Sequence, residues 1–260
     1  MNHSLQLRLE KRYSAGLSFL TSYTYGKALA NSPDHLSTSS QGNGTDVGIF
    51  KEPQNGYDRR SEYGPAEFDV RGRLVASAIW EIPFGRNRHF GSSTSRAADL
   101  LLGGWEIAPI VTAQSGLALT VIQPQLLNLG GERRSRPNRI GNGSVPESQR
   151  TVDRYLDASA FGILQVNPAL SGFVPFQAFG NSGIGILRGP GLANVDLNAS
   201  KSFRITERQS VQFRAEFFNL LNRTNLGVPG VSLEAGFGQI SQTSTEARII
   251  QFALDRKSVV

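Results

Sequence analysis

The sequence predicts an all-β fold in which antiparallel strands follow one another as a meander. The main observation is a strict alternation of side chains, clearest over residues 211–217, where Phe213 and Phe217 share one parity and Arg214 and Glu216 share the other. A period of two is the pattern of a half-buried strand. Turn residues separate the alternating stretches, and no run approaches the ~20 apolar residues of a membrane-spanning helix.

Alternation alone leaves two architectures open. In a soluble sandwich the polar face points to bulk water, and Trp80, Phe213 and Phe217 would pack against a second sheet. In a membrane barrel the polar face lines an aqueous lumen and the apolar face meets lipid. The hydrophobic content of 39% fits both architectures, because lumen-facing polar residues dilute the average of every barrel strand.

Charge and cysteine content exclude several classes of protein. The net charge of +6 comes from 27 basic and 21 acidic residues. These charges are scattered, without a basic helix or an RNA-binding aromatic signature, so nucleic acid is not an expected partner. The absence of cysteine excludes a disulfide scaffold and a thiolate zinc site, and it fits a chain that crosses an oxidising periplasm.

The first two predicted strands form a hairpin. Leucines alternate with polar residues over 3–12, and the small residues 14–16 supply a tight turn before a returning strand over 17–27. Phe19 and Tyr25 lie near the ends of that strand, as aromatic residues do at a bilayer interface. Ordinary β propensity explains these aromatic residues equally well.

Residues 28–65 predict a long loop, because they lack periodicity and are rich in Asn, Ser, Gly, Asp and Pro. Loops of this length are uncommon in compact domains but normal on the outer side of a barrel. Four carboxylates here lack EF-hand spacing, so a solvated loop is preferred to a calcium site. They are Asp34, Asp46, Glu52 and Asp58.

The longest predicted strand covers 68–83, with Leu74 and Trp80 on one face and Arg73 and Glu81 on the other. About sixteen alternating residues would extend roughly 50 Å at 3.3 Å per residue. Sandwich strands are usually shorter, so this length favours a tilted barrel strand. Pro83 and Gly85 end the strand, and 96–102 predict a short helix.

Alternation resumes over 105–114, where Pro109 cannot donate to a ladder and predicts a bulge or weak pairing. Ser115 and Gly116 predict a turn into a further strand over 117–122. A second long irregular region follows over 123–191.

The densest charge cluster of the chain lies in this second irregular region. Its arginines are candidates for contact with an anionic ligand or with the phosphates of outer-leaflet lipid. The alternative is a solvated loop, since charge runs are usually solvated. The candidates are Arg133, Arg134, Arg136 and Arg139.

The clearest hairpin joins 195–205 to 211–221, and a last pair of strands is predicted over 237–243 and 246–254. Lys201 is the one charged residue on the apolar parity of the first of these strands. A lone lysine in that position can extend to a membrane interface.

No catalytic arrangement is recognisable. His3, His35 and His89 are far apart and lack metal-ligand spacing, and no Gly-x-Ser-x-Gly elbow occurs. The polar-parity charges of the clearest hairpin are interpreted as cross-strand ion pairs rather than as acid-base machinery. These are Asp196, Arg204, Arg214 and Glu216. An enzyme is therefore not expected, and no cofactor or metal is predicted.

Five segments carry a family resemblance. AEFFNLLNRTNLG, residues 215–227, resembles the penultimate barrel strand and turn of Oar-like TonB-dependent outer-membrane receptors. Four further segments are similar to the last strands of that family, in the same order, so the resemblance covers most of the chain. They are 68–85, 104–116, 186–203 and 237–254. The resemblance implies part of a transmembrane β-barrel, open and incomplete, with about 7–9 strands and two long loops.

The resemblance also implies a location, partners and a function. Such receptors lie in the bacterial outer membrane, contact lipid and lipopolysaccharide, and often begin with a carboxypeptidase regulatory-like domain. They couple an internal plug to the TonB complex to take up a ligand. Because this chain has no plug or TonB-box candidate, we expect a fragment that needs the plug and the N-terminal barrel strands. The alternatives are an adhesin or secretion barrel independent of TonB, and a secreted β-sandwich binding module.

The barrel portion is expected to cover residues 1–254. Barrels of this kind normally close on a strand that ends in an aromatic residue, whereas here DRKSVV follows Leu254. One reading frame of a common sequencing adapter encodes the same six residues. We therefore expect 255–260 to be a non-native tail.

Overall fold

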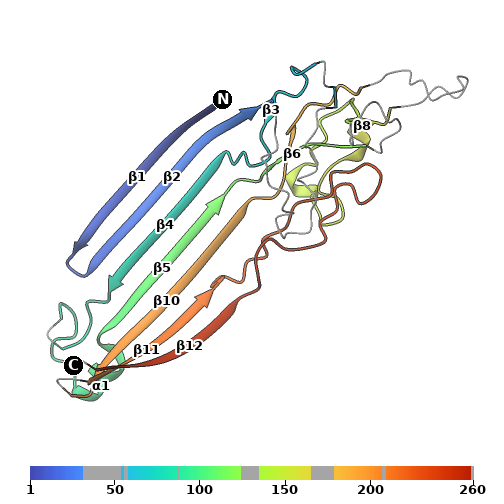
Figure 1. The fold of residues 1–260 in the computed structure, drawn as a ribbon. Helices are drawn as coiled ribbons and strands as arrows, with labels where there is room; N and C mark the ends of the chain where they lie inside the picture. The colour runs from blue at the N-terminus through green and yellow to red at the C-terminus, as the bar shows by residue number, and fades with distance from the viewer. Residues whose placement is uncertain are drawn as a thin grey trace, which may run out of the picture.

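One antiparallel sheet forms the body of the molecule (Figure 1). The computed structural model describes residues 1–31, 54–55, 58–86, 88–123, 135–164, 179–206 and 209–258. Seven long strands are hydrogen-bonded in the order β1-β2-β4-β5-β10-β11-β12, and the short β3 pairs with β2. Sheet order therefore follows chain order, as in a meander. The strands are β1 (Asn2–Ser14), β2 (Leu17–Ala30), β3 (Gly64–Pro65), β4 (Gly72–Glu81), β5 (Trp105–Gln114), β10 (Leu192–Arg204), β11 (Gln209–Phe218) and β12 (Ile249–Ser258).

Both edges of this sheet are open. Within the described residues, β1 and β12 each pair on one side, and they do not pair with each other. The predicted open meander of about 7–9 strands is thereby confirmed. Each edge presents a row of backbone N–H and C=O groups without a neighbouring strand.

The two ends of the sheet differ. At one end, here called the turn end, Ala15 and Gly16 join β1 to β2 with φ values of 53° and 75°, as a type I′ turn requires. The β4–β5 connection at this end carries α1 (Arg96–Leu102). The opposite end, here called the loop end, gathers the long β2–β4, β5–β10 and β11–β12 connections (Figure 1). The N-terminus lies at the loop end and the C-terminus at the turn end.

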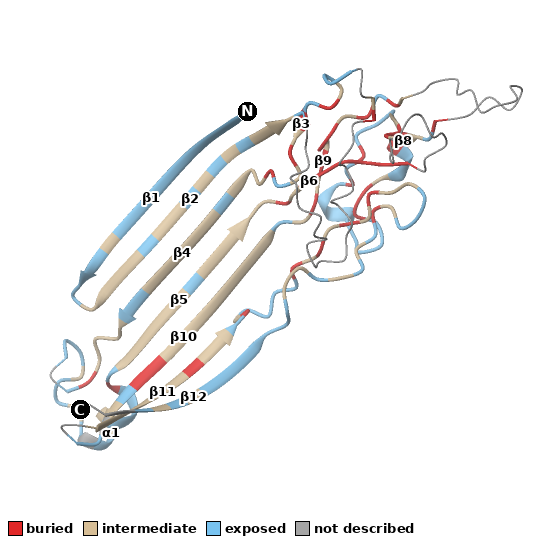
Figure 2. Cartoon of the chain, in the orientation of Figure 1, coloured by how far each residue is buried: buried red, intermediate tan, exposed pale blue. Residues whose placement is uncertain are grey.

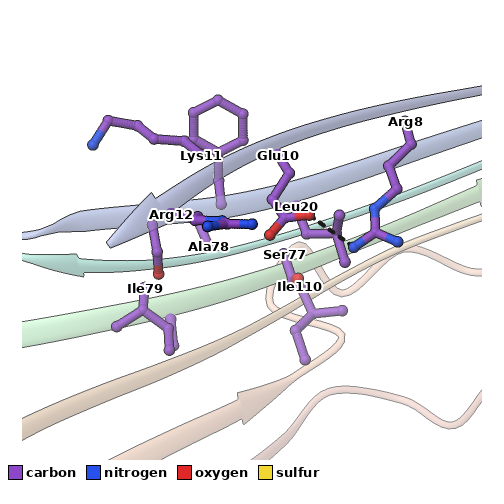
Figure 3. A pocket seen from close by; sticks show the side chains of 12 residues that line it. Arg8, Glu10, Lys11, Arg12, Leu20, Ser77, Ala78, Ile79 and Ile110 are labelled. Atoms are coloured by element: carbon purple, nitrogen blue, oxygen red, sulfur yellow. Dashed lines mark hydrogen bonds and ion pairs between the residues drawn. The ribbon is translucent and has the colours of Figure 1, made fainter. Parts of the chain in front are cut away.

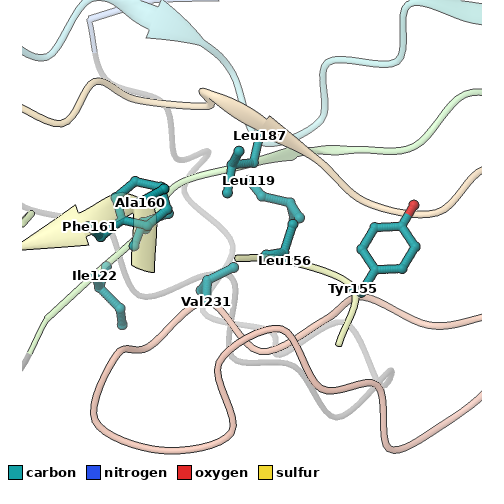
Figure 4. Packing of buried hydrophobic residues seen from close by; sticks show 9 residues of the cluster. Leu119, Ile122, Tyr155, Leu156, Ala160, Phe161, Leu187 and Val231 are labelled. Carbon is teal, nitrogen blue, oxygen red and sulfur yellow. The ribbon is translucent and has the colours of Figure 1, made fainter. Parts of the chain in front are cut away.

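The main cluster of buried apolar residues lies at the loop end, and in the described residues of the seven long strands only short stretches of β10 and β11 are buried (Figure 2). Two small sheets, β6–β9 and β7–β8, contribute Leu119, Leu187 and Phe161 to this cluster, and Leu119 and Val121 are fully buried. We call the described parts of the three long connections the loop-end cap. The other core residues are Ile122, Tyr155, Leu156, Ala160 and Val231 (Figure 4). The short elements are β6 (Ala118–Leu119), β7 (Asn138–Arg139), η1 (Glu147–Gln149), η2 (Ala158–Ala160), β8 (Phe161–Gly162) and β9 (Leu187–Arg188).

The region 123–191 contains only short elements where it is described, in agreement with the irregular region predicted there, although it supplies much of the cap core. Two predicted strands in these connections are wrong. The strand predicted over 117–122 shrinks to β6, which pairs with β9 inside the cap. The strand predicted over 237–243 is reduced to single bridges, because Gly236 and Gly238 adopt positive φ and bend the chain.

The strand predicted over 68–83 is also too long, because β4 begins at Gly72. Residues before it belong to the cap, where the Asp69 side chain is bonded. The helix predicted over 96–102 is confirmed as α1, and the Ser95 side chain caps it by accepting a hydrogen bond from Ala98 N. Among the described residues, no helix is long and apolar enough to cross a membrane.

Pro109 weakens one ladder, as predicted, without a bulge. The β5–β10 register runs continuously through Leu197↔Pro109. The β4–β5 ladder is interrupted between Ser77↔Ile110 and Trp80↔Ile107, with the register unchanged on either side. The missing N–H of proline therefore falls on the side of β4.

The last strand includes part of the predicted tail. β12 continues to Ser258, and Asp255 lies opposite Gln212. A backbone ladder accepts almost any side chain, so the foreign origin of residues 255–260 stays a prediction.

Candidate functional site: the two sheet faces and the loop-end cap

The sheet has one continuous apolar face. The register places Thr21, Ala76, Val111 and Val195 in one row across four strands, and side chains of the same parity lie on the same side of a sheet. We call this side the apolar face. Its larger members are Leu5, Leu7, Leu9, Phe19, Tyr23, Tyr25, Leu74, Trp80, Ile107, Leu197, Phe213, Phe217, Phe252 and Leu254.

In the described part of the chain, no second sheet covers this apolar face, and α1 packs against it only at the turn end. Leu7 is 55% exposed, Trp80 40% and Phe252 70%, and Phe213 and Phe217 are half-buried. The second sheet that the alternative sandwich would pack against Trp80, Phe213 and Phe217 is not present among the described residues. Soluble monomers rarely expose apolar patches of more than a few hundred Å², so a face that crosses seven strands requires an apolar environment.

The opposite face, here called the polar face, carries solvent-exposed ion pairs. Among the described side chains, Arg8 pairs with Glu10 at 2.8 Å, and Arg214 pairs with Glu216 at 3.5 Å and with Asp255 at 3.0 Å. All five groups are at least a quarter exposed. Exposed pairs contribute about 0–1 kcal/mol each to the free energy of folding. They are therefore compatible with a surface in contact with water but add little to its stability.

The cross-strand ion pairs predicted among Asp196, Arg204, Arg214 and Glu216 are present only in part. Arg214 does form a cross-strand ion pair, but its partner is Asp255. Asp196 instead accepts hydrogen bonds from the Asn194 side chain and from the backbone N–H of Asn219, at 2.8 and 2.9 Å. The side chain of Arg204 lies outside the described set.

A hollow of about 460 Å³ lies against β1, β2, β4 and β5, mainly on the polar face (Figure 3). Arg8 and Glu10 form its charged wall, while Leu20, Ile79 and Ile110 form an apolar floor. Figure 3 shows Lys11 pointing to the other side of the sheet. A hollow with mixed walls can accept an amphipathic surface, and the sequence pattern did not reveal it.

The arginine cluster takes a different role from the predicted one where it is described. Arg136 is 2% exposed and pairs with the buried Glu62 at 2.7 Å. Its Nε donates to Ser182 O at 2.7 Å and its Nη2 to Ser61 O at 3.0 Å. Arg136 therefore joins the β2–β4 connection to the β5–β10 connection inside the cap.

The remaining arginine candidates do not form one site with Arg136. Arg139 is exposed and donates through Nε to Gly141 O at 2.9 Å. Arg133 and Arg134 lie outside the described residues. Of the candidate calcium ligands, Asp34, Asp46 and Glu52 also lie outside them, and Asp58 accepts the backbone N–H of Arg60.

A second buried network fixes the start of β4. The Asp69 carboxylate is 1% exposed, pairs with Arg188 and with Arg71, and accepts the backbone N–H of Ala28 at 2.6 Å. Burial raises the pKa of Asp69, but the bond from Ala28 and the two guanidinium groups outweigh it, so the pKa lies below its ordinary value.

Replacing Asp69 with asparagine is expected to destabilise the cap by about 1–3 kcal/mol at neutral pH, because Arg188 loses its buried anionic partner. The depressed pKa of Asp69 means that its contribution is present above the ordinary value and is lost as pH falls through the lower folded-state pKa, below about pH 4. Urea unfolding of the cap at pH 7, 4 and 3, followed by pulsed hydrogen exchange, measures this. Asp58→Asn, at an exposed carboxylate of the same connection, is the control. An equal effect of the two variants would contradict the role given to Asp69.

The Asn-rich turn after β11 has a structural explanation. Asn219 is 5% exposed and has a φ of 50°, a conformation that asparagine tolerates better than most residues. Its amide donates to Arg223 O and Glu246 O, both at 3.0 Å, and accepts Arg223 N at 2.9 Å. Asn225 is 1% exposed and accepts the N–H of Ala193 at 2.9 Å. The NLLNRTN stretch therefore anchors the cap to β10 and β11.

Replacing Asn219 with alanine is expected to destabilise the protein by about 2–4 kcal/mol, because three hydrogen bonds are lost and alanine must keep a left-handed φ. Asn222→Ala is the matched control, since Asn222 has a φ of 49° but an exposed side chain that accepts a single hydrogen bond, from Arg248 N at 3.2 Å. We expect about 1 kcal/mol for the control. The free energy of unfolding in urea measures both, and equal losses would show that φ, and not the amide, matters.

The described residues contain no group of three His, Asp or Glu side chains that could hold a metal ion. The candidate site is a pair of surfaces, the polar face with its hollow and the cap at the loop end.

Comparison with known proteins gives one match. A family model described as "Outer membrane beta barrel domain" matches residues 2–251, nearly the whole chain. No curated protein and no solved structure matches the sequence.

Proposed function

Since this chain belongs to the outer membrane beta-barrel domain family, we propose that it forms the C-terminal part of a TonB-dependent receptor that takes up a ligand across the outer membrane. The family places the protein in the bacterial outer membrane. The long strands are therefore transmembrane strands.

One observation carries the proposal, namely the separation of the two faces over all seven strands. The apolar face suits hydrocarbon and the polar face suits an aqueous lumen, as in outer-membrane barrels. Short turns in such barrels face the periplasm and long loops face the exterior. The turn end is thus the periplasmic end, and the cap faces outward, where a ligand and lipopolysaccharide arrive.

The open edges support a role as part of a larger barrel. Each unpaired backbone group in hydrocarbon costs several kcal/mol, so β1 and β12 need neighbouring strands in the membrane. Plugged transporters close with about 22 strands, which makes the further strands and the plug of the same receptor the proposed partners. The chain by itself is not expected to transport.

The mixed hollow on the polar face adds support. An apolar floor formed by Leu20, Ile79 and Ile110 is out of place in an empty water-filled channel but suits a lumen that holds another protein surface. TonB coupling would act through that surface and not through this chain, whose sequence has no TonB-box candidate.

TonB dependence is tested on the complete gene that encodes this chain. The product, expressed with a photo-crosslinking residue at its periplasmic N-terminal segment, is expected to crosslink to TonB in energised cells. Crosslinking should fall when the proton gradient is collapsed. An adhesin or secretion barrel with the same sheet would reach the outer membrane equally well and give no TonB crosslink, and that result would overturn the proposal.

A further inference from the structure

α1 is held against the apolar face at the turn end. Trp105 Nε1 donates to Leu101 O at 3.0 Å. Lys201 Nζ donates to Gly103 O and, at 3.5 Å, to Asp99 O. Both donors lie on the apolar face, where Lys201 is opposite Trp105 in the register. Two side chains of the sheet therefore bind the C-terminal turn of the helix.

This contact explains the buried lysine that β10 places on the apolar face. Lys201 is 4% exposed, and its ammonium group lies 5.6 Å from the centre of the Trp105 ring and 5.3 Å from that of Phe203. Carbonyl groups at a helix C-terminus favour a cation. The sequence suggested that Lys201 can extend to a membrane interface; in the structure its ammonium group binds the C-terminal end of α1.

The helix leaves three consecutive leucines uncovered. Leu100, Leu101 and Leu102 are 59%, 71% and 55% exposed, and consecutive residues on a helix point in different directions. This apolar surface adjoins the apolar face through the bonds of Trp105 and Lys201. Because the protein belongs to an outer-membrane barrel family and its apolar face meets lipid, the leucine surface of α1 is continuous with the lipid-facing surface of the sheet.

The surrounding connection has the charge of a membrane-interface segment. Residues 82–104 contain Arg86, Arg88 and Arg96 against Asp99, a net charge of +2 from three basic and one acidic residue. Arg86 is exposed and Phe90 is 58% exposed. Exposed leucines and aromatic residues beside arginines are typical of helices that lie in a bilayer interface.

We propose that α1 is a membrane-interface anchor whose leucines enter the acyl-chain boundary of the periplasmic phospholipid leaflet. Trp105 and Lys201 hold it against the barrel wall, so the helix fixes the depth of the sheet in the bilayer. This proposal depends on membership of the outer membrane beta-barrel family and not on the proposed TonB coupling. It therefore applies equally to a barrel with another function.

The test uses spin labels in the complete outer-membrane protein, reconstituted in phospholipid nanodiscs with any cysteines outside this chain replaced. The chain itself has no cysteine, so single labels can be placed at Leu101→Cys, Leu7→Cys and Ile140→Cys. Leu7 lies on the apolar face and Ile140 in the cap, and the latter is 72% exposed, like Leu101. A high collision rate of a label with oxygen indicates that the label lies in lipid. A high collision rate with a water-soluble nickel complex indicates that it lies in water.

We expect the Leu101 label to collide preferentially with oxygen, as the Leu7 label does, while the Ile140 label collides with nickel. Nickel collision at Leu101 equal to that at Ile140 would overturn the anchor. Protection of Leu101 from both reagents would overturn it as well, since a protein partner would then cover the helix.

A second variant tests the clamp. Lys201→Met keeps an unbranched side chain on the apolar face but removes both bonds to α1. The Leu101 label is expected to become more mobile and at least threefold more accessible to nickel in this background, with the Leu7 label unchanged. An unaltered Leu101 label would show that Lys201 does not hold the helix.

Discussion

Replacing Arg136 with alanine is expected to destabilise the loop-end cap by about 3–5 kcal/mol, because it leaves the Glu62 carboxylate buried without its cation. Both side chains are at most 3% exposed and 2.7 Å apart. The substitution also removes donors from Ser182 O and Ser61 O. Hydrogen exchange in the complete outer-membrane protein measures the loss as faster exchange over residues 118–123 and 180–188, with the transmembrane strands unchanged.

Arg139→Ala is the matched control, because Arg139 lies three residues away and is exposed. We expect a change of no more than about 0.5 kcal/mol for this variant. The double variant Arg136→Met with Glu62→Leu should recover much of the loss, since a buried ion pair can be replaced by apolar residues without a large penalty. If Arg136→Ala and Arg139→Ala behave alike, Arg136 is not a structural residue and its candidacy for ligand contact returns.

Replacing Val111 with arginine is expected to destabilise the membrane-inserted protein by about 2–4 kcal/mol, the effect of an arginine near the bilayer midplane on the lipid side of a barrel. Val111 lies in the apolar row with Ala76 and Val195, well inside β5. Urea unfolding of the complete protein in phospholipid vesicles, followed by tryptophan fluorescence, measures this value.

Thr112→Arg provides the control on the opposite face. Thr112 is the next residue of β5 and lies between Val75 and Asn194 on the polar face. A lumen-facing arginine remains hydrated, so we expect a change within about 1 kcal/mol. A larger loss for Thr112→Arg than for Val111→Arg would reverse the assignment of the two faces.

The transmembrane strands could be predicted because their signal is local. Alternation in β1, β2, β5, β10 and β11 follows from the pleat, which places successive side chains on opposite faces. The boundaries were less accurate, as β4 shows. Asp69 continues the alternating pattern of that strand, but its carboxylate is bonded in the cap, and no local pattern reports that bond.

The cap could not be predicted for the opposite reason. Its core combines β6, the η2–β8 segment, β9 and residues near Val231, and two-residue strands are too short to show a period. Arg136 illustrates the same limit. Its partner Glu62 is 74 residues away, so the sequence showed a dense basic run and predicted a surface contact where the structure has a buried ion pair.

The sequence by itself determined which side chains share a face, because strand geometry links position and direction through steric rules that hold at every residue. Tertiary structure alone decided which strands are edges, that the cap has a core, and that Lys201 lies beneath α1. Those features depend on strand register and on contacts between segments that are distant in the sequence. The free energy of such contacts depends on both segments, so no single stretch of the chain predicts it.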